Sequence, residues 1–225
     1  MRYIQKQQPP QTFLNWTKSS TDLKYKNLPG DVKADLKQAL LMEQGYLCAY
    51  TMKRITMRTS HVEHFFSQSQ FSEKSLDFKN MIACYPERGV TSAPKNVEYG
   101  AVYKDNNTEE ICSPHKKGVS DQFIFKLNGK VEGTTDVART TIRVLNLNHD
   151  DLVRERREWI EVAISRATSG GKFSPKKARS AISTLEKPDQ SGKLEPFCTA
   201  MIQVLSDLAK KAEARAARLK KASSR

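Results

Sequence analysis

The sequence lacks the features that would place it in a membrane or among several common enzyme classes. No apolar run approaches the roughly 20 residues that a helix needs to cross a bilayer. The N-terminal stretch MRYIQKQQPPQTFLNW has no apolar segment of the kind found in signal peptides. The chain also has no phosphate-cradling glycine loop, no nucleophile elbow and no dinucleotide fingerprint. We therefore expect a cytoplasmic protein with no membrane partner.

Cysteine is scarce, and its four copies lie far apart at Cys48, Cys84, Cys112 and Cys198. Without a secretion signal they are expected to be reduced thiols or metal ligands rather than disulfides. Cys198 falls in a helical run and is expected in the core. The other three are either metal ligands or ordinary small buried residues.

Acidic residues are outnumbered, because 38 Lys and Arg stand against 25 Asp and Glu for a net charge of +13. Such an excess favours a polyanionic partner, with DNA or RNA foremost. A basic tract from Lys210 to Lys221 ends the chain. It is interpreted either as a solvated helix face or as a phosphate-contacting tail.

The periodicity indicates a mostly helical α+β protein. Residues 1–45 should form an arm with a short helix near Phe13 and a second helix over 31–44. Phe123–Gly133 alternates around Asn128-Gly129, which predicts a hairpin. The chain from 135 to 225 should be helical, with His149 or Asp150 near a cap. Between these parts, the polar segment 87–110 predicts a long inserted loop.

One group of polar residues needs an explanation, for which the ordinary structural alternative is that His64 is a core histidine with a satisfied ring. Glu63 directly precedes His64, and Asn80 and His115 follow in "LDFKNMIAC" and "CSPHKKG". Carboxylate, imidazole and amide together suit metal-assisted phosphodiester hydrolysis. Glu63 and His115 can hold a divalent cation, and His64 can accept a proton from water. If the strand bends at the pair, both neighbours can face one phosphate.

These motifs, "LLMEQGYLCAYTMKRI…HVEHFFSQS…LDFKNMIACY…CSPHKKG", resemble the HNH endonucleases with their ββα-metal core. More narrowly, residues 1–120 are similar to the HNH subunit (PtuB-like) of Septu-type and retron-associated anti-phage defence systems. The resemblance implies that Glu63 and His115 bind the catalytic metal, His64 is the general base, and Asn80 orients the base and its loop. The nuclease core would then span 46–134, with 135–225 as a helical, partner-docking region.

The resemblance also implies cofactors and partners. The catalytic cation is expected to be Mg²⁺ or Mn²⁺, with Zn²⁺ or Ni²⁺ as alternatives. Relatives hold a structural zinc ion with four cysteines, but here "CAYT" places Thr51 where a second cysteine is expected, leaving Cys48, Cys84 and Cys112. The expected partners are a PtuA-like ATPase, a retron reverse transcriptase with its RNA–DNA hybrid, and a DNA or RNA substrate.

Two other hypotheses remain open. The chain could be a non-catalytic zinc module that binds nucleic acid or bridges proteins. It could also be a helical adaptor whose HNH-like core has decayed. Glu63, His64 and Asn80 separate the nuclease from the zinc module, because a binding module has no need of them. Phe65 and Phe66 are expected to pack in the core rather than to stack on bases, and His61 is expected to be exposed or to support the site.

Overall fold

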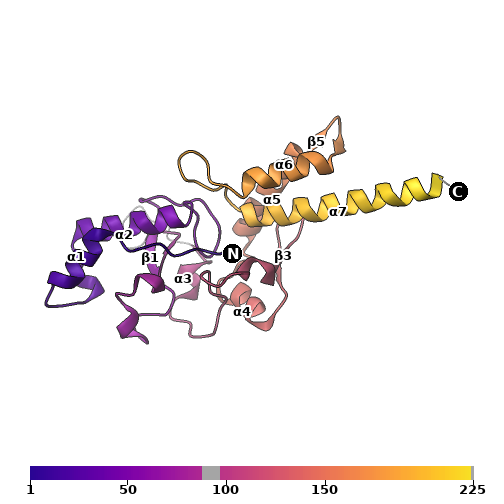
Figure 1. Ribbon diagram of the computed structural model, residues 1–225. Helices are drawn as coiled ribbons and strands as arrows, with labels where there is room; N and C mark the ends of the chain where they lie inside the picture. Colours follow the sequence, from indigo (N-terminus) through magenta and orange to yellow (C-terminus); the bar gives the residue numbers. More distant parts are fainter. Residues whose placement is uncertain (88–96, 224–225) are drawn as a thin grey trace.

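The computed structural model describes residues 1–87 and 97–223 (Figure 1). Its α-helices are α1 (Gln11–Ser19), α2 (Gly30–Glu43), α3 (Ala101–Lys104), α4 (Asp136–Val144), α5 (Asp150–Arg166), α6 (Pro175–Leu185) and α7 (Cys198–Ser223). Short 3₁₀ turns are η1 (Tyr25–Asn27), η2 (Ser72–Lys74), η3 (Phe78–Asn80) and η4 (Val119–Gln122). The strands are β1 (His61–His64), β2 (Met81–Cys84), β3 (Phe123–Phe125), β4 (Val131–Gly133), β5 (Thr168–Ser169) and β6 (Lys172–Phe173). The predicted α+β, mostly helical class is confirmed.

The strands form antiparallel pairs: β1 with β2, β3 with β4, and β5 with β6. β2 reads Met-Ile-Ala-Cys and is buried along its whole length, so the β1–β2 pair lies inside the protein. In this pair Glu63 is opposite Ile82 and His64 is opposite Met81. The β1–β2 pair therefore holds the Glu-His dipeptide at the level of the core.

The Asn128-Gly129 hairpin forms as predicted. Gly129 has φ of +85°, and a Cβ atom there would lie 2.2 Å from the carbonyl oxygen of Val153 on α5. Only glycine fits both the turn and this close approach. His149 caps α5 by accepting a hydrogen bond from the backbone N–H of Asp151. The hairpin and the cap thus fix α5 against the β3–β4 pair.

The C-terminal helices share one core with the elements before them. The Gln203 side chain on α7 accepts from Phe125 N at 2.6 Å and donates to the carbonyl of Phe123 at 2.9 Å. Cys198 is fully buried at the start of α7, as predicted. These bonds cross the boundary predicted at residue 134, so α7 and the hairpin are packed as neighbours. Figure 1 shows α1 and α2 at one end of the molecule and the last turns of α7 projecting at the other.

Two features of the middle segment bear on the sequence predictions. Part of the long loop predicted over 87–110 falls on residues 88–96, which lie outside the described residues. The remainder contains the short helix α3, whose last residue, Lys104, is buried. Among the described residues, no helix is long and apolar enough to span a bilayer.

Candidate active site

Strand β1 carries the Glu-His pair without a bend between the two residues. The pairing with β2 continues through His64, and the N–H of Phe65 still donates to the carbonyl of Asn80 at 2.8 Å. Successive side chains of a strand point to opposite faces. Glu63 therefore shares a face with His61, and His64 lies on the other. The chain bends one residue later, at Phe65 and Phe66.

Asn80 closes the loop that follows β1. Its Oδ1 accepts from the backbone N–H of Phe66 at 2.8 Å, and its Nδ2 donates to the carbonyls of Phe66 at 3.0 Å and Lys74 at 3.2 Å. The side chain is buried. One amide thus ties both ends of the segment 66–74 to the start of β2. This geometry is what the predicted orienting role requires.

His64 is held in a defined orientation by two hydrogen bonds. Its Nε2 lies 2.9 Å from the carbonyl oxygen of Ser75, so Nε2 carries the proton and donates. Nδ1 is then the acceptor, and the side-chain amide of Gln68 donates to it at 3.0 Å. The ring of Tyr25 meets His64 edge-on at 4.7 Å. Burial lowers the pKa of His64, although the bond to Ser75 and the charge of Glu63 oppose this effect.

These contacts are compatible with the predicted role of His64 as a general base. Burial favours the neutral imidazole, one nitrogen is held as a donor, and the other accepts from the exposed side chain of Gln68. Movement of Gln68 would remove the hydrogen bond to that lone pair.

Glu63 lies between a histidine and a lysine. The carboxylate is 9% exposed; its Oε2 is 3.3 Å from Nε2 of His61, and its Oε1 is 3.6 Å from Nζ of Lys104. His61 is itself buried, and its Nδ1 donates to the carbonyl of Pro86. The sequence predicts that His61 is either exposed or supports the site, and its burial and its contact with Glu63 agree with the second of these. The strand period explains the contact, because residues two apart share a face.

His115 lies in a turn beside the N-terminal arm. The carbonyl of the preceding residue, Pro114, accepts from the N–H of Ile4 at 2.8 Å. Burial and then the positive charge of Lys6 lower the pKa of His115, whereas the backbone of Ile4 and the charge of Asp77 act in the opposite sense. Neither buried ring nitrogen makes a hydrogen bond within the described residues. Those residues also do not group His115 and Glu63 with a third such ligand, so the predicted cation site is not preformed.

The cysteines expected to bind zinc are brought together only in part. Burial raises the pKa of the Cys48 thiol, but hydrogen bonds from Cys84, Thr51 and the N–H of Tyr85 outweigh it and lower the pKa to about 6. Thr51, at the position of the missing cysteine, thus contacts Cys48 directly. The thiol of Cys112 instead donates to Oε1 of Gln122 at 3.4 Å.

The metal predictions can be tested against these donor sets. In the part of the chain that the structure describes, no group of three or more His, Cys, Asp and Glu side chains is arranged to hold a metal ion. A closed zinc site needs four ligands, and a thiol pair with a hydroxyl does not supply them. At Glu63, the ammonium group of Lys104 would repel a divalent cation. The described residues therefore do not fit a preformed metal centre.

Lys104 is the functional candidate that the sequence did not reveal. It is 5% exposed, and "AVYKDNN" carries no pattern that distinguishes this lysine from the other cations of the chain. The prediction that Phe66 packs in the core is wrong, because its side chain is 42% exposed and lines a pocket. Phe65, by contrast, is half-buried and packs against the core, as expected, while also reaching the pocket.

Comparison with known proteins adds no assignment. No protein-family model matches the chain, and a search of curated proteins finds no matching relative. The interpretation of the site therefore depends on its residues and their geometry.

Proposed function

We propose that this chain is an endonuclease of the HNH type that hydrolyses phosphodiester bonds in DNA or RNA. The observation that carries the proposal is the state of His64: a buried imidazole with Nε2 donating to Ser75 and the Nδ1 lone pair accepting from the exposed side chain of Gln68. A histidine that merely filled the core would not need a separate loop to orient it. Asn80, with three hydrogen bonds to that loop, supplies this orientation.

In the proposed reaction, His64 takes a proton from water at Nδ1 as the water oxygen attacks phosphorus. The bond from phosphorus to the leaving oxygen then breaks, and that oxygen takes a proton from solvent. Gln68 is exposed, so its amide can leave Nδ1 and make way for the water. The Nε2–Ser75 bond strengthens as the ring becomes positively charged, which favours proton uptake.

Positive charge for the substrate comes from lysine. Lys104 faces Glu63 at 3.6 Å, which is longer than a normal hydrogen bond, so its ammonium protons can turn toward a phosphate oxygen. The chain's net charge of +13 adds a sequence-independent attraction for nucleic acid. Glu63 balances Lys104 until the substrate arrives.

The proposal includes an ATPase partner that controls the nuclease within an anti-phage defence complex. Support comes from the sequence resemblance and from α7, whose last turns are exposed and rich in lysine and arginine. We infer that this end of α7 takes part in docking. Removal of residues 212–225 should abolish co-purification with a PtuA-like ATPase while leaving the chain folded.

The direct test is cleavage of plasmid DNA and total tRNA by the wild type, His64→Ala and His149→Asn. Each mixture is run with Mg²⁺, Mn²⁺, Zn²⁺ or Ni²⁺ and with EDTA, alone and with the ATPase. His149→Asn is the matched control, because asparagine still caps α5. The proposal predicts cleavage by the wild type and the control, and none by His64→Ala. Loss of cleavage in EDTA would show that a cation is recruited together with the substrate, and cleavage that persists in EDTA would fit the protein side chains acting alone. The two substrates separate DNA from RNA.

The alternative of a non-catalytic zinc module gains no support from the described cysteines. Equal nucleic-acid binding by all three proteins, with no cleavage in any mixture, would favour that module over the nuclease.

A further inference from the structure

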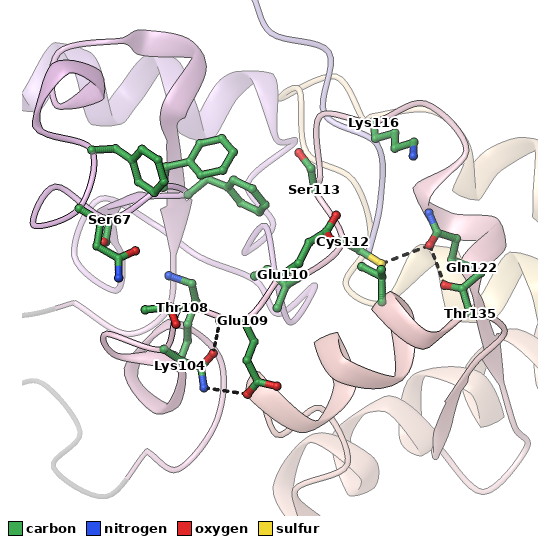
Figure 2. Close-up of a pocket in the computed structure, with 17 residues that line it drawn as sticks. Ser67, Lys104, Thr108, Glu109, Glu110, Cys112, Ser113, Lys116, Gln122 and Thr135 are labelled. Carbon is green, nitrogen blue, oxygen red and sulfur yellow. Dashed lines mark hydrogen bonds between the residues drawn. The ribbon is translucent and has the colours of Figure 1, made fainter.

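A pocket of about 570 Å³ lies between the segment that follows β1 and the last residue of α3, Lys104 (Figure 2). Its volume falls in the range of roughly 300–1,000 Å³ typical of ligand sites. One wall is the segment that follows His64, with the rings of Phe65, Phe66 and Phe71. Lys104 and Lys116 also line it, and Cys112, Ser113 and Gln122 lie across from the rings. The pocket thus combines aromatic rings with two cations.

The aromatic wall is fixed in place before any ligand binds. The Phe66 ring meets Phe65 at 5.1 Å and Phe71 at 5.2 Å, both edge-on. The ammonium group of Lys74 lies 4.0 Å from the centroid of Phe66. Asn80 bonds both backbone groups of Phe66. Because Lys74 covers one face of this exposed ring, a flat ligand would stack on the other face, at little entropic cost.

The pocket suits a flat ligand that carries an anionic group: the aromatic wall fits the flat part, and the lysines fit the anionic group. Lys104 is buried and shares its charge with Glu63 at 3.6 Å, whereas Lys116 is exposed and places a second cation at the pocket rim. Glu109 also lines the pocket, but its charge is balanced by an ion pair with Arg143. Glu110, a further lining residue, can accept from the amino group of a base.

We propose that this pocket binds one unpaired nucleobase of the strand that is cleaved. The inference rests on the proposed function and names its substrate class: single-stranded or looped nucleic acid. The segment 65–71 connects the two sites, because Gln68 contacts His64 while Phe65, Phe66 and Phe71 face the pocket. With a base stacked on Phe66, the sugar-phosphate backbone attached to that base would run across this segment toward His64. A paired base cannot reach such a ring without leaving its duplex.

The test uses fluorescence of 2-aminopurine in a short oligonucleotide, bound to protein that carries His64→Ala to prevent cleavage. Single-stranded DNA, single-stranded RNA and the matching DNA duplex are compared. Stacking on Phe66 should quench the single strands and leave the duplex unchanged. Phe66→Leu should weaken single-strand binding roughly tenfold and abolish the quenching, whereas Phe66→Tyr should retain both. Phe173→Leu, on β6 away from the pocket, is the matched control.

Equal quenching of the duplex, or unchanged binding by Phe66→Leu, would overturn the inference. Its failure is distinct from failure of the nuclease proposal. Cleavage that needs His64 without any effect of Phe66→Leu would remove the pocket and keep the nuclease. Quenching lost in Phe66→Leu, together with a wild type that cleaves nothing, would keep the pocket and remove the nuclease. Melting curves of both leucine variants establish that each is folded.

Discussion

Replacement of Asn80 tests the link between the loop and the base. Asn80→Ala removes three side-chain hydrogen bonds and leaves backbone groups of Phe66 and Lys74 without their partner. At about 1 kcal/mol each, the free energy of unfolding should fall by about 3 kcal/mol. Because the same loop carries the Ser75 carbonyl and Gln68, orientation of His64 should also be lost. We therefore expect cleavage to fall by more than the folded fraction does.

Asn80→Asp gives a sharper version of this test. The introduced carboxylate can still accept from Phe66 N–H, but its second oxygen would face the carbonyls of Phe66 and Lys74. Only its protonated form can donate to a carbonyl, so the pKa of this carboxyl should be raised in the folded state. Its stabilisation should then be present at low pH and be lost as pH rises through that pKa.

The assay is urea denaturation followed by circular dichroism at several pH values. Asn15→Ala is the control, since Asn15 is exposed on α1 and its loss should change stability by less than about 0.5 kcal/mol. A loss below about 1 kcal/mol in Asn80→Ala would refute the reasoning. A pH-independent difference between the alanine and aspartate variants would contradict the assigned orientation of the amide.

Three further predictions concern charge, pH and the hairpin. Lys104→Met should raise KM and remove about one phosphate contact, which lowers the slope of log affinity against log salt concentration by about one. An unchanged slope in a salt titration would count against a phosphate-binding role for Lys104. Because burial lowers the pKa of His64, kcat/KM should rise to half its maximum at a pH below about 6.5 and stay high above it; a midpoint above pH 7 would conflict with this. Gly129→Ala should lower the free energy of unfolding by more than about 2 kcal/mol, because the new Cβ would overlap the carbonyl oxygen of Val153. Gly170→Ala is the control: its Cβ meets nothing within 4 Å, so only its φ of +55° should cost stability, about 1 kcal/mol. Equal losses in melting experiments would contradict this packing.

Local patterns explain the parts of the fold that the sequence predicted. The Asn128-Gly129 turn, the His149 cap and the burial of Cys198 each depend on a few neighbouring residues and a well-known period. Glu63 and His64 lie on β1, and Asn80 ends the 3₁₀ turn directly before the paired strand β2, so short-range order also places these three residues. In these places the local preference and the tertiary packing agree.

The remaining features depend on contacts between distant segments. Lys104 reaches Glu63 across 41 positions of the chain, with 104 − 63 as the separation, and no local pattern marks the lysine that will be buried. Cys112 is similar in type to Cys48 and Cys84, but a glutamine 10 residues further along the chain accepts from its thiol. For the cysteines, residue type and order along the chain suggested a set of zinc ligands. Which side chains meet is decided by their positions in space, which the order along the chain does not give.

The most direct test of the account is chemical rescue at His64. His64→Gly removes the base and leaves a space against Tyr25 and Ser75 for a free imidazole. The account predicts that this variant cleaves no nucleic acid alone and recovers measurable cleavage as imidazole is added, with Asn80 intact. Rescue should disappear in the double variant with Asn80→Ala. Full cleavage by His64→Gly without imidazole would contradict the assignment of His64 as the general base.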